Sequence, residues 1–307
     1  GLKALNGDQI PLLIGVDQEG GLVDRMPPEV HRTPGAYAVG STSDWDQGRA
    51  LGAALAAECA GFGFHLDFAP VLDVWSNPDN TVIGKRAFGS DWKVVSGFGA
   101  AVSNALQAAG VIPVVKHFPG HGDTVVDSHM GLPVVDKSLE DLSLQELPPF
   151  RDLISGGETP SGRAEAVPAV MVAHILMTQL DPDLPASLSP AVVTDLLRGE
   201  LGFGGVVFTD DLTMGAITQN YGLGEAAVLA VEAGCDMLLV CHGRDSVDAA
   251  RSALLEAAAS GRISQARLDE SVRRILSLKL EYGVSGEPVS APDLNALNAL
   301  VDAVAAQ

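Results

Sequence analysis

The sequence predicts an α/β fold in which parallel strands alternate with crossover helices. Short apolar, β-branched runs recur along the 307 residues, Ala-rich amphipathic stretches separate them, and the apolar runs are nearly continuous. Strand followed by helix, repeated, indicates parallel pairing, and strands that are apolar throughout are typical of a sheet covered on both faces. A hydrophobic fraction of 47% is ample for a sizeable core.

Six segments are predicted to be strands. In order they are Ile10–Val16, Leu66–Leu72, Val111–Val115, Ala169–Ala173, Gly205–Phe208 and Met237–Val240. The helical stretches between and after them include Trp45–Cys59, Trp92–Ala109, Pro190–Leu201 and Ser246–Ala259. The segment Ser155–Pro168 is rich in Gly, Ser and Pro, which predicts an exposed loop.

Six strands are two short of a closed eight-stranded parallel barrel. We therefore predict a (β/α)8 barrel of the TIM type with an incomplete or missing first strand, which lies upstream of Gly1 or is absent from the fold. Residues 1–285 are expected to form this barrel as one domain, with Arg262–Tyr282 as its closing helix. Residues 286–307 are expected to form a Pro-containing linker and a short Ala/Leu helix.

Composition narrows the classes of partner. A formal net charge of −20 and a pI near 4.5 argue against nucleic acid and anionic membrane surfaces. No apolar run approaches the length of about 18 residues that a membrane span needs. Cys59, Cys235 and Cys241 form neither a disulfide framework nor a CxxC pair. The chain starts at Gly1 without a methionine, so we expect a trimmed N-terminus; the compartment, cytoplasmic or extracytoplasmic, and the oligomeric state stay open.

Ionisable residues stand at the C-terminal end of five predicted strands. These positions are Asp17, Asp73, Lys116-His117, His174 and Asp210-Asp211. In parallel barrels the C-terminal strand ends and the loops that follow them build the functional site. Five such positions at the same end are hard to explain as ordinary surface charge, so the pattern predicts a site there.

The densest group of polar residues runs from Lys116 to Thr124 and continues to Asp127 and His129. Its glycines and proline predict a loop that can approach a ligand closely. Three His and two Asp raise the possibility of a metal site, but the spacing is unlike that of zinc sites, and we predict neither metal nor cofactor. Proton chemistry is the alternative, because a carboxylate such as Asp127 can orient a histidine such as His129 and favour its protonated form.

At these residues the sequence resembles family 3 glycoside hydrolases, specifically their β-N-acetylglucosaminidase branch, which serves bacterial cell-wall recycling. Four segments carry the resemblance: Asp17–Gly21 with Arg25, Ile83–Phe88, Lys116–His129, and Leu196–Glu200 running on to Gly205–Asp210. They span nearly the whole chain, and the Lys-His-Phe-Pro-Gly-His-Gly tract is the most specific. The resemblance implies a catalytic barrel without the extra domains of many β-glucosidases of the family.

The resemblance assigns a role to each matching position. It implies Asp210, directly after a threonine, as the nucleophile, whereas the residues themselves do not discriminate between Asp210 and Asp211. It implies His129 as the acid/base, with Asp127 as its partner. The sugar contacts that it implies are Asp17, Arg25, Arg86, Lys116 and His117. One departure is Lys85, where relatives often carry an acidic residue; no catalytic position is missing.

The implied activity is that of a retaining β-N-acetylglucosaminidase. It would remove non-reducing terminal N-acetylglucosamine from small carbohydrates, peptidoglycan fragments above all, through a glycosyl-Asp210 intermediate. Phosphorolysis of the same bond and action on chitin oligosaccharides stay open as alternatives. From other classes, a sugar-binding barrel would lack Asp210 and His129, and a metal-dependent hydrolase would lose its activity to chelators.

Overall fold

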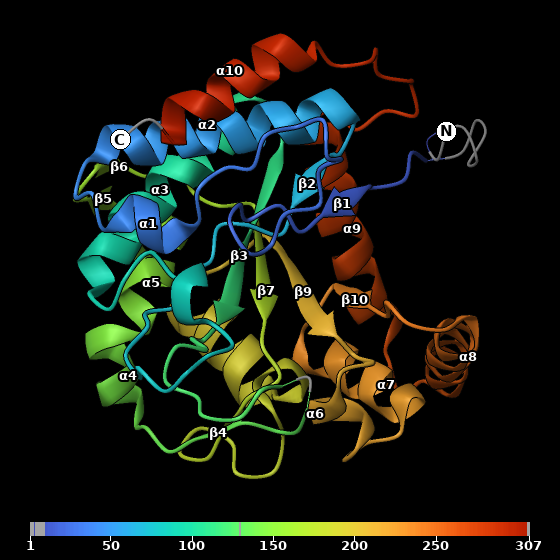
Figure 1. The fold of residues 1–307 in the computed structure, drawn as a ribbon. Coiled ribbons are helices and arrows are strands. Elements are labelled where there is room, and N and C mark those ends of the chain that lie inside the picture. The colour runs from blue at the N-terminus through green and yellow to red at the C-terminus, as the bar shows by residue number, and fades with distance from the viewer. Residues whose placement is uncertain (1–2, 4–9, 129, 306–307) are drawn as a thin grey trace.

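The protein is described here by a computed structural model that covers residues 3, 10–128 and 130–305. Its centre is a curled, six-stranded parallel sheet, about half of a barrel (Figure 1). All six predicted strands are confirmed. In spatial order they are β1 (Gly15–Val16), β2 (Leu66–Asp67), β3 (Ile112–Phe118), β7 (Ala169–Val172), β9 (Val206–Asp211) and β10 (Met237–Leu239).

The first two strands are much shorter than the apolar runs predicted. β2 ends at Asp67 because Pro70, two residues beyond Phe68, has no N–H to donate to a neighbouring strand. The segment nevertheless stays beside β3. Val71 forms an isolated parallel bridge with Lys116, whose carbonyl accepts from Leu72 N at 2.6 Å. The predicted strand segment Leu66–Leu72 therefore lies along β3 but forms regular strand pairing only at its start.

Both faces of the sheet are buried, as the continuous apolar runs predicted. Alternate residues of β7 point to opposite sides: Val170 and Val172 belong to the main core under the surrounding helices, whereas Met171 lies in a second cluster inside the curl. This inner cluster includes Leu278 of α9 (Gln265–Glu281), so α9 covers the inner face of the sheet.

Helices surround the sheet on its outer side (Figure 1). The predicted helices correspond to α2 (Trp45–Phe62), α3 (Trp92–Ala108), the π-helical segment η4 (Ala191–Glu200), α8 (Arg244–Ser260), α9 and α10 (Leu294–Ala305). The sequence reasoning missed α1 (Ala36–Gly40), α4 (Leu139–Gln145), α5 (Leu147–Ser155), α6 (Gly215–Thr218) and α7 (Leu223–Ala233). Short segments complete the fold: η2 (Gly84–Arg86), η3 (Ala186–Leu188), and the strand pairs β4 (Val134–Val135) with β8 (Leu176–Met177) and β5 (Glu158–Thr159) with β6 (Gly162–Arg163).

Two peripheral segments differ from expectation in how much structure they form. Within Ser155–Pro168, predicted as a loop, β5 and β6 pair as a small antiparallel hairpin. The C-terminal helix α10 packs against α2, and its residues Val301 and Val304 belong to the main core (Figure 1). Among the described residues, no helix has the length and apolar character to cross a membrane.

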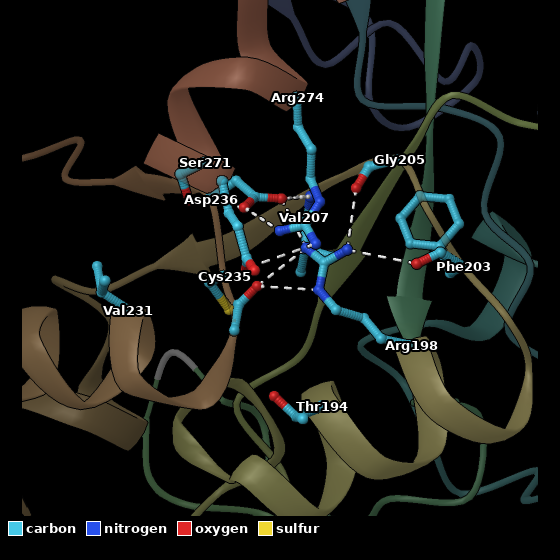
Figure 2. Close-up of polar contacts among 12 residues, drawn as sticks. Thr194, Arg198, Phe203, Gly205, Val207, Val231, Cys235, Asp236, Ser271 and Arg274 are labelled. Carbon is cyan, nitrogen blue, oxygen red and sulfur yellow. Dashed lines mark hydrogen bonds and ion pairs between the residues drawn. The ribbon is translucent and has the colours of Figure 1, made fainter. Parts of the chain in front are cut away.

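The N-terminal end of the sheet holds a buried ionic group that we call the Asp236 cluster (Figure 2). Asp236, whose side chain is fully buried just before β10, accepts hydrogen bonds from Arg198 Nη2 at 2.6 Å, Ser271 Oγ at 2.6 Å and Arg274 Nη1 at 3.1 Å. It also accepts from the backbone N–H of Val207 at 3.1 Å. The cluster thus joins η4, β9 and α9 at the N-terminal ends of the strands.

Candidate active site

The opposite, C-terminal end of the sheet contains a cavity of about 550 Å³. The arrows of β3, β7 and β9 point to this end, where the loops that follow the strands gather (Figure 1). Six predicted site residues line the cavity together: Asp17, Arg25, Arg86, Lys116, His117 and Asp210. They come from the loop after β1, from η2, and from the ends of β3 and β9. The convergence that the strand-end pattern predicted is therefore present.

The loop after β1 turns sharply at Gly20 and Gly21, with φ of 80° and 58°. A Cβ atom on Gly20 would lie 2.4 Å from Thr33 Oγ1, and one on Gly21 would lie 2.5 Å from the Cα of Gly35. Both positions therefore require glycine for conformation and for space. The turn places Asp17 and Glu19, which precede it, on the cavity wall.

Glu19 is a cavity residue that the sequence reasoning did not single out. Its carboxylate accepts two hydrogen bonds from Arg86, from Nη2 at 2.7 Å and from Nε at 2.9 Å. It also pairs with Lys116 Nζ at 2.7 Å. Lys116 in turn donates to Asp17 Oδ1 at 2.7 Å, so one buried ammonium joins two carboxylates. We call Asp17, Glu19, Arg86 and Lys116 the Glu19 cluster.

The charges of the Glu19 cluster stabilise one another. Burial alone would raise the pKa of Glu19, but Lys116 and Arg86 overcome it and lower that pKa to about 2. Burial would likewise lower the pKa of Lys116, but the charges of Glu19 and Asp17 raise it instead. Glu19, Arg86 and Lys116 are therefore ionised at neutral pH, and together with Asp17 they present fixed hydrogen-bonding positions to the cavity.

His117 is oriented by Asp73, which lies behind it and is fully buried. Asp73 Oδ2 is 2.6 Å from His117 Nδ1, and Asp73 Oδ1 accepts from the backbone N–H groups of His117 at 3.2 Å and His121 at 2.7 Å. Burial opposes ionisation of Asp73, but the charge and hydrogen bond of His117 keep its pKa low. Asp73 thus holds the cavity-lining histidine from behind.

Asp210 is half-buried at the end of β9 and lines the cavity. Its Oδ1 accepts from the backbone N–H of Asp211 at 2.8 Å. Burial raises its pKa, but His174, His117, this backbone N–H and Lys116 together lower it, so the carboxylate is ionised. The Asp211 carboxylate is engaged instead with the backbone N–H groups of Thr213 at 3.0 Å and Cys241 at 2.9 Å. Both aspartates line the cavity, and they differ in the partners that engage their carboxylates.

The predicted acid/base pair is only partly described. His129 lies outside the described residues. Its neighbour Ser128 lines the cavity, and the Ser128 carbonyl accepts from Ala216 N of α6 at 2.9 Å. The Ser128 hydroxyl is 3.2 Å from Nε2 of the buried His121. Asp127 is half-buried next to Ser128 and, in the described part of the chain, is not a lining residue.

Gln18 supports the β1 loop from behind and was also missed. Its backbone N–H donates to Asp67 at 2.9 Å, and its side-chain amide donates to Glu58 at 2.7 Å and to Asp24 at 3.1 Å. The Gln18 amide oxygen accepts from the backbone N–H of Arg25 at 2.7 Å. Burial raises the pKa of Glu58 to about 7. One fully buried amide thereby fixes the backbone that carries three cavity residues.

The missed residues carried a weak signal in the sequence. Glu19 and Gln18 stand inside the Asp-Gln-Glu-Gly-Gly segment, but nothing in a linear pattern indicates that Glu19 pairs with Arg86, which is 67 positions away. His121 is in the histidine-rich loop, yet burial keeps it neutral and lowers its pKa to about 4. Among the described residues, no group of three or more His, Cys, Asp or Glu is arranged to hold a metal ion.

A family model described as the glycosyl hydrolase family 3 N-terminal domain matches residues 2–278. The chain is 39% identical over 280 residues to the beta-hexosaminidase LpqI of Mycobacterium tuberculosis, an alignment that covers 89% of this chain and 69% of that protein. It superposes with a TM-score of 0.90 and 44% identity on a glycoside hydrolase family 3 β-N-acetylglucosaminidase from Paenibacillus sp. str. FPU-7, covering 97% of this chain and 56% of that one. A beta-glucoside phosphorylase, BglX, superposes with a TM-score of 0.86 at 26% identity, covering 97% of this chain and 55% of that one.

Proposed function

We propose, from the premise that this chain belongs to glycoside hydrolase family 3, that it is a retaining β-N-acetylglucosaminidase specific for the non-reducing terminal sugar. One observation carries the proposal. The ionised carboxylate of Asp210 shares a 550 Å³ cavity with the fixed donors and acceptors of the Glu19 cluster. Such a cavity suits a polyhydroxylated ligand held beside a nucleophile.

Asp210 is the proposed nucleophile. A carboxylate attacks the anomeric carbon only when ionised, and the positive groups around Asp210 keep its pKa below the ordinary value. Attack forms a bond between an Asp210 oxygen and the anomeric carbon while the bond to the leaving oxygen breaks. A second displacement by water frees the carboxylate and restores the original configuration at that carbon.

His129, with Asp127, is the proposed acid/base. The imidazolium would protonate the leaving oxygen in the first step, and the neutral imidazole would remove a proton from water in the second. A histidine with a pKa near neutrality serves both steps because they need opposite protonation states. The anchoring of the adjacent Ser128 to α6 and to His121 supports this assignment, since it holds the start of the acid/base segment at the cavity wall.

The proposed sugar contacts are Asp17, Arg25, Arg86, Lys116 and His117. Arg86 and Lys116 have already committed donors to Glu19, so each would meet the sugar with the donors that remain. This pairing lowers their freedom before any ligand arrives, and preorganised polar groups lose less entropy when they bind. Glu19 therefore joins the proposed set as the residue that orients both cations.

We further propose that the six-stranded sheet is part of a (β/α)8 barrel. β1 and β10 are its two edges in the described part of the chain, and a barrel closes when such edges find partner strands. In this proposal residues 1–285 contribute to the catalytic barrel, and residues 286–307 form the linker and short helix. The position of the cavity at the C-terminal end of the strands agrees with that architecture.

Peptidoglycan fragments are the proposed natural substrates, with chitin oligosaccharides as the rival. Phosphorolysis is a second candidate because of the structural likeness to a beta-glucoside phosphorylase, and because a histidine in place of an acid/base carboxylate would not repel phosphate. Incubating the enzyme and a β-N-acetylglucosaminide with and without inorganic phosphate separates the two reactions. We expect free N-acetylglucosamine in both cases; a sugar 1-phosphate as main product would favour phosphorolysis.

Covalent trapping tests the proposed function. The protein is incubated with a slow, mechanism-based N-acetylglucosaminide donor and mapped by peptide mass spectrometry. We expect the label on Asp210, and Asp210→Asn should abolish it. Asp211→Asn is the matched control, because the same change one residue away should leave the label on Asp210. Label on Asp211, or none from a donor that the protein does turn over, would overturn the assignment.

A further inference from the structure

His174 is a fully buried titratable residue that the proposed mechanism does not use. It follows β7 and, among the described residues, is not one that lines the cavity. Its Nε2 is 3.0 Å from the backbone carbonyl oxygen of Asp211, and its Nδ1 is 2.7 Å from the hydroxyl of Ser187. Both ring nitrogens are therefore engaged, one of them with the strand that carries Asp210.

The partners of His174 determine its tautomer. A carbonyl oxygen can only accept, so Nε2 bears the proton and donates to Asp211. The Ser187 hydroxyl then donates to the bare Nδ1. Burial lowers the pKa of His174, which agrees with a neutral ring. In this neutral form His174 acts as a fixed donor to the Asp211 backbone, and its charge lowers the pKa of Asp210 only when the ring is protonated.

The place of this hydrogen bond follows from the register of the sheet. The β7–β9 ladder ends with the pair Val172 and Thr209, and two residues further along each strand stand His174 and Asp211. The backbone on either side of His174 has turned to another partner, since Ala173 O accepts from Ser187 N and Ile175 O accepts from Ala186 N. The imidazole therefore links the two strands at the point where their backbone hydrogen bonds have ended.

Asp210 lies between the last ladder residue of β9 and the residue that His174 holds. Its Oδ1 accepts from the Asp211 N–H, so the carboxylate depends directly on where the Asp211 backbone lies. On the other side of β9, the Asp211 side chain binds Cys241 N beyond β10. The end of β9 is thus held towards β7 by His174 and towards β10 by the Asp211 carboxylate.

We propose that His174 is a positioning residue for the nucleophile: by donating to the Asp211 carbonyl from the end of β7, it sets the place of the Asp210 carboxylate in the cavity. This inference rests on the proposed function. His174 touches neither the cavity nor the reacting atoms. It acts through the Asp211 backbone, and a misplaced reacting group can lower a rate by about 10²-fold.

The test compares two substitutions of His174 with p-nitrophenyl N-acetylglucosaminide as substrate. His174→Phe keeps much of the volume and removes the donor; we expect kcat to fall by about 10- to 100-fold while KM changes by less than about threefold. The trapping rate of Asp210 by the slow donor should fall by the same factor. His174→Gln restores an N–H donor near the position of Nε2 and should recover most of both rates.

His65→Phe is the matched control. His65 also joins backbone segments, accepting from Ile14 N at 3.1 Å and lying 3.2 Å from the Ser285 carbonyl, but at the opposite end of the sheet. It should lower thermal stability without lowering kcat. If His174→Phe fails to fold, Ser187→Ala takes its place. It removes the hydroxyl that fixes the tautomer of His174, and we expect a smaller fall in kcat.

The outcomes separate this inference from the proposed function. A wild-type protein that releases no N-acetylglucosamine contradicts the proposed function. A wild-type protein that does so, with His174→Phe equal to it in kcat and trapping rate, overturns the positioning role alone. The role is also overturned when folded His174→Gln shows no recovery, or when His65→Phe lowers kcat as much as His174→Phe does.

Discussion

The two ends of the sheet each hold a buried ionic group, but the groups are built differently. In the Asp236 cluster, the guanidinium of Arg198 also donates to the carbonyls of Phe203 and Gly205 (Figure 2). It donates to the Gly234 carbonyl as well, so its donors are used within the protein. In the Glu19 cluster, the charged groups pair with one another along a cavity wall. The first arrangement engages every N–H of the Arg198 guanidinium within the protein, whereas the second leaves donors and acceptors facing open space.

This difference teaches how to distinguish a structural ion pair from a functional one. Burial alone does not do so, because the side chain of Asp236 is 0% exposed and that of Glu19 only 5%. The two kinds of ion pair differ in whether their unused hydrogen-bond donors and acceptors face a cavity. Removal of a group from the closed cluster should cost stability, and removal of a group from the open end should cost activity.

The largest effect is expected at the open end. Asp210→Asn removes the proposed nucleophile, so kcat should fall by at least about 10³-fold. The loss of unfolding free energy should stay below about 2 kcal/mol, because Asp210 is half-buried and the amide can be hydrated from the cavity. Steady-state kinetics and urea denaturation measure the two quantities. A near-normal kcat of Asp210→Asn would contradict the functional role of this end of the sheet.

The same substitution at the closed end should do the reverse. Asp236→Asn leaves the guanidinium groups of Arg198 and Arg274 without their buried counter-charge, so the free energy of unfolding should fall by about 3–5 kcal/mol. Molecules that remain folded should keep a normal kcat, since the cluster is remote from the cavity. Urea denaturation with active-site titration checks this, and an unchanged stability would contradict the structural role.

A smaller effect, dependent on pH, is expected at Glu58 behind the β1 loop. Its pKa is raised from 4.5 to about 7 by burial, so the folded state holds the proton more tightly than the unfolded state. This contribution to stability is complete below the unfolded pKa and is lost as the pH rises through the folded pKa. Between about pH 5 and pH 8, Glu58→Gln should lose about 1–3 kcal/mol less stability than the wild type. Urea denaturation of both proteins at the two pH values measures this. An equal loss of unfolding free energy in the variant and the wild type would refute the prediction.

The smallest effect is expected for an exposed ion pair. Arg262 binds Glu225 and Glu232 at 2.7 Å and 2.9 Å, distances as short as those in either buried cluster. Because these charges face solvent, Arg262→Ala should leave the midpoint of thermal unfolding nearly unchanged. Thermal denaturation at low and high salt measures it. A loss as large as that of Asp236→Asn would show that distance, rather than burial, governs these pairs.

The sequence predicted the six strands of the sheet and six of the residues that line the cavity. Continuous apolar runs identify strands covered on both faces, and the polar residue after each run marks the strand end, because both signals are local. The missed helices α5 and α7 are shorter than α2 and α3, and their apolar stretches resemble strands in a single sequence. The bounds of β1 and β2 were misjudged for a related reason, since the apolar run begins before β1 and continues after β2.

What the sequence determined by itself was the chemistry available at one end of a parallel sheet, including an aspartate after β9 and a lysine and histidine at the end of β3. Tertiary structure alone decided which polar groups meet: Glu19 with Arg86, Asp73 with His117, and His174 with the Asp211 backbone. These pairs join residues 67, 44 and 37 positions apart. Such contacts depend on strand register and on the turn at Gly20 and Gly21, which leave no periodic trace in the chain.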